Sequence, residues 1–225
     1  MLRTGLVLAL SAVLAAAARA EGEEACRPLP GVGCWFAPEG APPDAPLLVY
    51  LRGHHRSHGP NVPAGLWLAS SRQAFAAYEL GRTAREKGVV VLVTYRSGLG
   101  VKAADVAAVA AEAKRTFPTT ILAAHSGGYV GLGATLDAGL SPSRVVMLDN
   151  FYGAGAGGLT QKLQRAISAG AACAGFHTPH NKKNYDKGYR NAVACSVDAM
   201  ASDADHGAAV VRCLAGYLDG RSCLR

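Results

Sequence analysis

The chain has 225 residues, half of them hydrophobic, which suits one domain with a sizeable core. Its 23 Lys and Arg exceed its 16 Asp and Glu, but apart from residues 52–58 the basic residues are scattered. No long basic tract alternates with aromatic residues, so the composition disfavours a nucleic-acid partner. The mild positive excess fits attraction to an anionic envelope or substrate.

Residues 1–20 are typical of an export signal. Arg3 supplies a positive start, residues 6–18 form an apolar core, and Ala18-Arg19-Ala20 matches a small-residue cleavage site. The apolar core is too short to cross a bilayer comfortably as a membrane anchor. We therefore expect cleavage after Ala20, a mature chain of residues 21–225 without a transmembrane segment, and a periplasmic or secreted location.

Six cysteines lie in the expected mature chain, and an even number in an exported protein favours disulfides. Six cysteines allow fifteen pairings, so the sequence leaves the connectivity open. We expect the local pairs Cys26–Cys34, Cys173–Cys195 and Cys213–Cys223. The absence of a C-x-x-C pair disfavours a zinc ribbon or a thioredoxin-type site.

Predicted elements alternate along most of the chain. Residues 21–46 are rich in Pro, Gly and Glu and are expected to form a strapped N-terminal segment. Strands are predicted over residues 47–51, 89–94, 120–124, 144–148, 171–177 and 192–197, and helices over 69–87, 103–117, 128–138, 159–169 and 206–218. This alternation predicts a single α/β domain with a mostly parallel sheet and helices on both faces.

The segment around Ser126 has the pattern of a nucleophile elbow, a sharp strand-to-helix turn that exposes a serine hydroxyl. An apolar run ends at this serine, and a Gly-rich, helix-compatible stretch follows it. The turn requires small residues two positions before and after the serine, and Ala124 and Gly128 meet that requirement. We therefore expect Ser126 to be a catalytic nucleophile.

A serine hydroxyl needs a base within hydrogen-bond reach, and the base needs an orienting acid. His206 is the best candidate base, because it follows the last predicted strand and opens the last helix. Asp149 directly follows the strand over residues 144–148 and is the favoured acid. Asp186 and Asp198 remain alternatives, because they lie after the later predicted strands.

Acyl hydrolysis also needs donors for the oxyanion that develops on the substrate. One donor is expected to be the backbone N–H of Gly127, and the other the N–H of His54 in the loop after the first strong strand. Gly53 would allow that loop to approach the site closely. Three side chains near the same sheet edge are expected to contact substrate: Arg52, Tyr129 and Tyr152.

Two groups of histidines invite other interpretations. His54, His55 and His58 could bind a metal, but no carboxylate lies nearby in sequence, so a polar loop without a metal is favoured. His177 and His180 belong to a polar stretch that we expect to be a surface loop, bordering the pocket at most.

Together these motifs resemble the α/β-hydrolases over about residues 45–220. The resemblance implies a three-layer fold with an eight-stranded, mostly parallel sheet, and acyl transfer to water through Ser126, His206 and Asp149 without a cofactor. The chain differs from the usual pattern in several ways. Ala124 replaces a glycine, Arg52 stands where many members have histidine, and the segment between the last two strands looks too short for a full helix. The acid would also lie one strand earlier than in most members.

The sequence thus predicts an exported, monomeric serine hydrolase that cleaves a carboxylic ester of a small-molecule or envelope-derived acyl substrate. Three alternatives stay open at this level. The chain could be an amidase or peptidase acting on envelope material, because the same residues serve amide hydrolysis. It could also be a ligand-binding protein on a hydrolase scaffold, or a metal-binding envelope protein.

Overall fold

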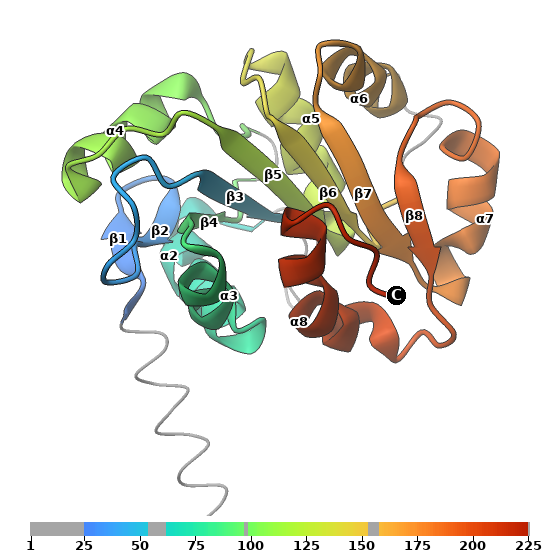
Figure 1. Cartoon of the computed structure of the whole chain (residues 1–225), viewed down its shortest axis with the longest axis horizontal. Helices are drawn as coiled ribbons and strands as arrows, with labels where there is room; N and C mark the ends of the chain where they lie inside the picture. Colours follow the sequence, from blue (N-terminus) through green and yellow to red (C-terminus); the bar gives the residue numbers. More distant parts are fainter. Residues whose placement is uncertain (1–24, 54–61, 97–98, 153–157, 225) are drawn as a thin grey trace, which may run out of the picture.

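The computed structural model describes residues 25–53, 62–96, 99–152 and 158–224, and its centre is an eight-stranded sheet (Figure 1). The expected signal segment and His54, His55 and His58 lie outside the described residues. The strands are β1 (Arg27–Leu29), β2 (Gly33–Phe36), β3 (Leu47–Arg52), β4 (Val90–Thr94), β5 (Thr120–His125), β6 (Arg144–Leu148), β7 (Ala172–His177) and β8 (Ser196–Ala199).

The spatial order of the strands is β1-β2-β4-β3-β5-β6-β7-β8. In this order, the strands β4, β3, β5, β6, β7 and β8 run parallel to one another. At one edge, β2 pairs antiparallel with β4, and β1 pairs antiparallel with β2. Every residue of β4 and β5 is buried, because helices cover both faces of the sheet. The predicted mostly parallel α/β architecture and the implied eight strands are confirmed.

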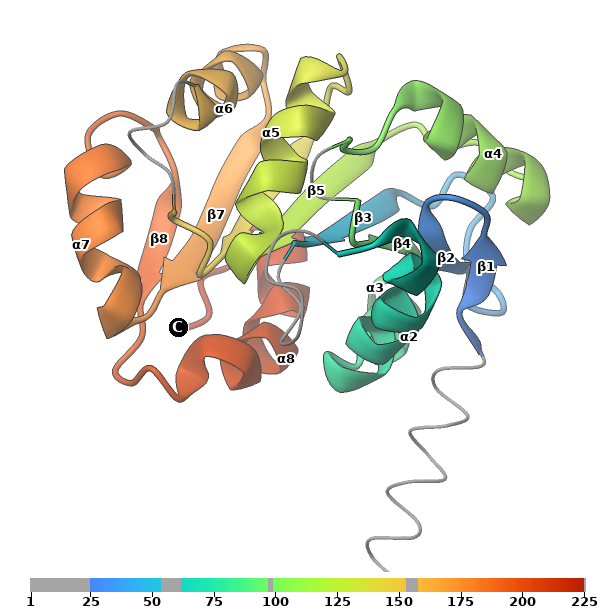
Figure 2. The same cartoon turned by 180° about the vertical axis from the view of Figure 1, so that it is seen from behind.

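Helices on the two faces form the outer layers (Figures 1 and 2). On one face, α2, α3 and α8 bury Phe75, Leu80 and Leu214 against the sheet. On the other, α4, α5 and α6 bury Val109, Leu132 and Leu163. The helices are α2 (Trp67–Ala77), α3 (Leu80–Lys87), α4 (Ala103–Ala113), α5 (Tyr129–Asp137), α6 (Leu159–Ser168), α7 (Pro179–Gly188) and α8 (Asp205–Leu218), with 3-10 turns η1 (Ala64–Leu66) and η2 (Ser126–Gly128).

Two predicted helices are shorter than expected because a residue adopts left-handed backbone geometry. The single helix predicted over residues 69–87 is two helices, and Glu79, with a φ of 49°, separates them. The break allows both Phe75 and Leu80 to reach the same core. Helix α4 ends four residues early, because Lys114 has a φ of 52°.

The largest difference between the predicted and the observed elements lies between β7 and β8. The expected surface loop is helix α7, so the expectation that this segment is too short for a full helix is wrong. Strand β8 also begins at Ser196, four residues later than predicted. Helix α7 buries a single residue of its own, Asn181, so it has no apolar stripe to reveal it. Thr178 before Pro179 is the one helix-start signal in the stretch.

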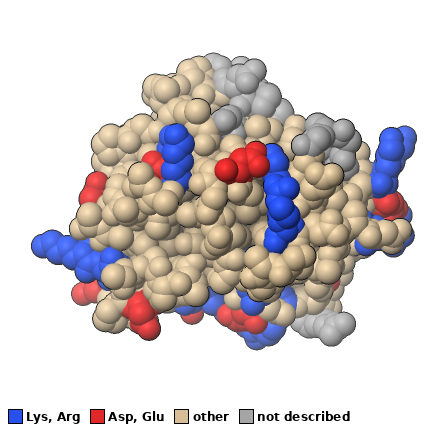
Figure 3. Space-filling model, turned by 90° about the horizontal axis from the view of Figure 1, so that it is seen from above, with Lys and Arg blue, Asp and Glu red and all other residues tan. Residues whose placement is uncertain are grey.

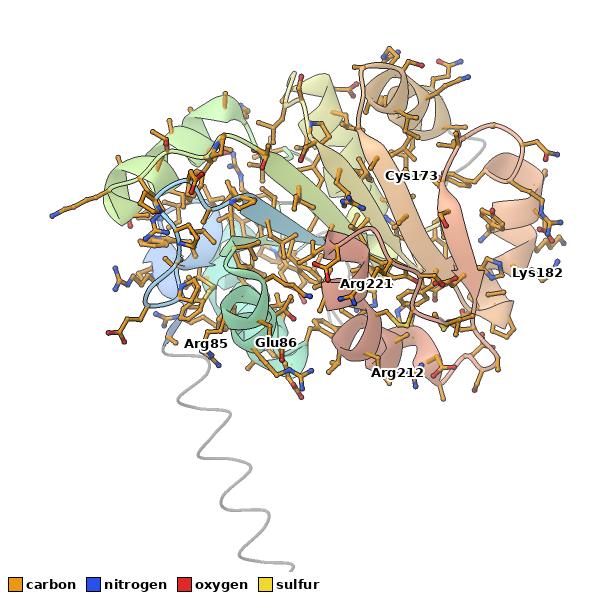
Figure 4. The ribbon with its side chains drawn as sticks, in the orientation of Figure 1. Arg85, Glu86, Cys173, Lys182, Arg212 and Arg221 are labelled. Carbon is orange, nitrogen blue, oxygen red and sulfur yellow. A yellow bond between two sulfur atoms is a disulfide. The ribbon has the colours of Figure 1, made fainter. Side chains whose placement is uncertain are left out.

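The three local cysteine pairs are confirmed as disulfides. Cys26–Cys34 joins the two antiparallel edge strands. Cys173 of β7, labelled in Figure 4, bonds Cys195 just before β8, and Cys213–Cys223 ties the end of the described chain to α8. Three disulfides fit an oxidising, extracytoplasmic compartment.

The surface shows no gathering of basic charge on the face seen in Figure 3, where Lys and Arg side chains stand apart and Asp or Glu lies beside several of them. Among the helices of the described residues, none combines the length and the apolar character needed to cross a bilayer.

Removing the disulfide between β7 and β8 tests its contribution to stability. Replacing both Cys173 and Cys195 by Ala opens a disulfide-closed loop whose ends are 22 positions apart. The unfolded chain gains conformational entropy, so the free energy of unfolding should fall by about 3 kcal/mol. Urea denaturation of wild type and variant without reductant measures the difference. A double variant as stable as wild type would show that this bond does not hold the sheet edge.

Candidate functional site

Ser126 lies at a strained turn between β5 and α5. Its φ is 54°, a left-handed conformation that costs a non-glycine residue about 1 kcal/mol or more. The residues two positions before and after Ser126, Ala124 and Gly128, are small because the turn packs tightly around them. A Cβ on Gly128 would lie 2.2 Å from the Leu51 carbonyl oxygen and 3.6 Å from the Ala124 Cβ. The local geometry therefore has the form expected of a nucleophile elbow.

Gly53 brings the loop after β3 against this turn. A Cβ at Gly53 would lie 2.1 Å from the carbonyl oxygen of Gly127, so any other residue would push the two segments apart. Gly127 is buried directly after Ser126. His54, the other expected oxyanion donor, lies outside the described residues, so the roles of both N–H groups stay predictions.

Asp149 follows β6 in a second strained conformation, with a φ of 48° and a side chain only 1% exposed. Its carboxylate accepts hydrogen bonds from the Thr178 N–H at 2.8 Å, the Thr178 hydroxyl at 3.0 Å and the Asn181 amide at 2.9 Å. Burial alone would raise the pKa of Asp149, but hydrogen bonds from His206, Thr178 and Asn181 outweigh it and lower the pKa. The carboxylate is therefore ionised at neutral pH.

His206, in the first turn of α8, meets this carboxylate. Its Nδ1 lies 2.6 Å from the second Asp149 oxygen, and the two residues are 57 positions apart in the chain. An ionised carboxylate can only accept, so Nδ1 carries the proton. In the neutral imidazole, Nε2 is then free to accept a proton. The imidazole is about one-third exposed, so it is open to a substrate.

The two alternative acids lie elsewhere. Asp186, on α7, pairs with Lys182 of the same helix and with Arg190 just after it, and Lys182 lies on the outer side of α7 (Figure 4). Asp198, in β8, accepts hydrogen bonds from the Tyr217 hydroxyl at 2.8 Å and the Cys223 N–H at 2.7 Å. Of the three carboxylates, Asp149 is the one that contacts the imidazole of His206.

An open cleft of about 300 Å³ lies over the Asp149–His206 pair. It is lined by Asp149, Tyr152, Thr178, His180, Asp203 and His206. His180 lies in the first turn of α7, where its N–H donates to Asp203 at 2.7 Å. The sequence favoured a surface loop that borders the pocket at most, and His180 does line this cleft. No sequence pattern indicated Asp203, or Thr178 and Asn181 as donors to Asp149.

The three expected substrate contacts divide into two groups. Tyr152 lines the cleft, and its ring centroid lies 5.9 Å from that of Tyr129. Arg52 instead donates from Nη1 to the backbone oxygen of His125 at 3.4 Å. This contact braces the end of β5 next to Ser126.

Comparison with known proteins gives a match in structure. No protein-family model matches the sequence, and no curated protein matches it. The crystal structure of LpqC, a poly(3-hydroxybutyrate) depolymerase from Bordetella parapertussis, superposes with a TM-score of 0.50 over 84% of this chain and 85% of the other, at 14% sequence identity. The chain has the α/β-hydrolase fold. In this chain the acid candidate Asp149 follows β6, which is one strand earlier than in most members of the family that the sequence resembles.

The lowered pKa of Asp149 predicts how stability depends on pH. The ionised carboxylate stabilises the fold fully above its unfolded pKa, near 3.8, and this contribution is lost as pH falls through the lower folded pKa. Asp149→Asn should therefore have a lower free energy of unfolding than wild type at pH 7. This gap in free energy should narrow below pH 3.8.

Urea denaturation from pH 7 to pH 2.5 measures this gap, with exposed Asp44→Asn as the matched control. A gap between Asp149→Asn and wild type that stays constant with pH would contradict the assignment of the ionised form.

Proposed function

We propose that this α/β-hydrolase is an exported serine hydrolase that cleaves carboxylic esters. Ser126 is the nucleophile, His206 the base and Asp149 the orienting acid. The observation that carries the proposal is the 2.6 Å hydrogen bond between Asp149 and His206. The His206 ring lies 4.7 Å, centroid to centroid, from the ring of His125, the residue directly before Ser126. With Ser126, Asp149 and His206 follow the chain order Ser, Asp, His.

The chemistry begins with the Ser126 hydroxyl. His206 Nε2 accepts its proton as Oγ attacks the ester carbonyl carbon. The N–H groups of Gly127 and His54 stabilise the oxyanion. The tetrahedral intermediate collapses as the alcohol leaves with the proton from His206. Water then attacks the acyl-enzyme, again giving its proton to His206, and the carboxylic acid leaves as Ser126 regains its hydrogen.

Asp149 acts on this cycle through His206. It holds the proton on Nδ1 and so keeps Nε2 available to Ser126. When His206 becomes positively charged, the adjacent ionised carboxylate stabilises that charge. The four groups around Asp149 fit this role, because they keep a buried carboxylate ionised and fixed in direction.

The substrate we propose is an acyl ester, small or derived from the envelope, that reaches an oxidising compartment. The three disulfides support an exported location, together with the signal-like residues 1–20. The described residues leave the cleft open, which suits an extended substrate. The similar structure of a depolymerase supports ester hydrolysis as a class. Nothing in the mechanism requires a metal or a second copy of the chain.

Removal of the nucleophile is the first test of this function. Ser126→Ala should lower kcat for p-nitrophenyl acetate and butyrate by at least about 10³-fold, because no other group provides the covalent step. Ser141→Ala changes an exposed serine at the far end of α5 and should leave kcat unchanged. Full activity in Ser126→Ala would refute the mechanism. Matched p-nitroanilides distinguish an esterase from an amidase, because the ester assignment fails if only the anilides react.

Replacement of the acid gives a second prediction. Asp149→Asn should lower kcat by about 10⁴-fold, because an amide can present N–H to His206 and favour the wrong tautomer. Asp186→Asn is the control. It removes the charge of an aspartate on α7 that does not contact His206, and it should change kcat by less than about two-fold. Steady-state kinetics at pH 7.5 compares the two. Equal losses in both variants, or a larger loss in Asp186→Asn, would contradict the assignment of Asp149.

A further inference from the structure

His125 is a buried histidine directly before Ser126, and the proposed reaction gives it no role. It is the last residue of β5, and its side chain is fully buried on the sheet face that α8 covers. A buried polar side chain is costly unless its donors and acceptors find partners. The partners of His125 are therefore informative about what holds it there.

Both ring nitrogens of His125 have hydrogen-bond partners. Nε2 lies 3.1 Å from the backbone oxygen of His206, 81 positions away in the chain, and Nδ1 lies 2.9 Å from the Tyr50 hydroxyl. A carbonyl oxygen can only accept, so Nε2 carries the proton and donates to His206. Nδ1 then accepts from the hydroxyl of Tyr50. One neutral tautomer satisfies both contacts.

The surroundings of the ring keep it neutral. Burial of the imidazole, together with the positive charges of Arg52 and of protonated His206, holds the pKa of His125 well below its usual value. The ring centroids of His125 and His206 are 4.7 Å apart, and the Tyr78 ring packs edge-on at 4.9 Å. A second cation at this distance would oppose the charge that His206 gains during the reaction.

Two strands thus contact the same residue of α8 in different ways. Asp149, after β6, binds the ring of His206 and sets its orientation. His125, at the end of β5, binds the backbone oxygen of His206 and sets its position. Among the described residues, the other backbone–backbone bonds at the start of α8 are local. One of them runs from the His206 N–H to the Asp203 oxygen at 3.1 Å. His125 therefore supplies a long-range hydrogen bond to the His206 backbone, in addition to the side-chain bond from Asp149 and the packing of α8 on the sheet.

We propose that His125 is a positioning residue, which fixes the His206 backbone relative to Ser126 through the Nε2–H bond to the His206 oxygen. The inference rests on the proposed function of Ser126 and His206. Because His125 is covalently joined to Ser126, one buried side chain links the nucleophile's own backbone to that of the base. A shift of about 1 Å between such groups can cost about 10²-fold in rate.

Variants of His125 separate positioning from simple core packing. His125→Phe removes the donor to His206 and should lower kcat by about 10 to 100-fold while KM changes by less than about two-fold. His125→Gln places an amide N–H near the position of Nε2 and should recover most of that loss. Tyr217→Phe is the matched control, because it removes a buried hydroxyl that bonds Asp198 near the other end of α8. It should lower stability and leave kcat unchanged.

The measurements are ester kinetics at a temperature where each variant is fully folded by circular dichroism. A kcat within two-fold of wild type in folded His125→Phe, with Ser126→Ala inactive, would overturn the positioning role and leave the proposed function intact. Full activity in Ser126→Ala would instead refute the proposed function itself. Equal loss of kcat in His125→Gln and His125→Phe would also overturn the proposal, because the donor would then be irrelevant.

A measurement on the wild-type protein tests the same bond if His125→Phe fails to fold. Imidazole ¹H–¹⁵N spectra report which ring nitrogen carries the proton. We expect His125 to be neutral and protonated on Nε2 at pH 7, with a proton that exchanges slowly because the ring is buried. A proton on Nδ1 would remove the donor to His206 and overturn the proposal.

Discussion

The hydrogen bond between Asp149 and His206 is the interaction on which the rest of the site depends. A carboxylate that is almost fully buried is stable only when its oxygens are satisfied, and the donors come from three places. Thr178 and Asn181 lie at and after the start of α7, and His206 lies at the start of α8. The carboxylate therefore holds the ends of β6 and β7 and the starts of both helices in one arrangement.

Backbone strain accompanies this arrangement at two strand ends. Ser126 and Asp149 both have left-handed geometry, which the surrounding sheet must enforce. The parallel strands β5 and β6 are neighbours, so the two strained residues leave the sheet at the same edge. Close backbone contacts at Gly53 and Gly128 hold the nearby turns against each other without room for a side chain. Rigid strands thus fix the positions of residues that lie in turns.

The elements that were predictable from sequence are those with a strong apolar signal. Strands such as β4 and β6 are mostly apolar runs buried on both faces. The elbow pattern, places after predicted strands and chain order selected Ser126, Asp149 and His206 as candidates. They left Asp186 and Asp198 as alternative acids. Helix α7 was missed because almost all of its residues are polar and it buries only Asn181. The donors Thr178 and Asn181 lie about 30 positions from Asp149, and no local pattern encodes such a contact. The break at Glu79 depends on core packing that propensity does not reveal.

The decisive experiment is to label the folded protein with a fluorophosphonate and to locate the adduct by intact-mass analysis and peptide mapping. Such probes react with a serine only when a neighbouring base activates it and the cleft is open. If Ser126, His206 and Asp149 act together, we expect one adduct per chain, on Ser126. The Asp149→Asn variant should form this adduct much more slowly than wild type. An unlabelled folded protein, or an adduct on another serine, would contradict the account. The first of these results would favour a ligand-binding protein on a hydrolase scaffold.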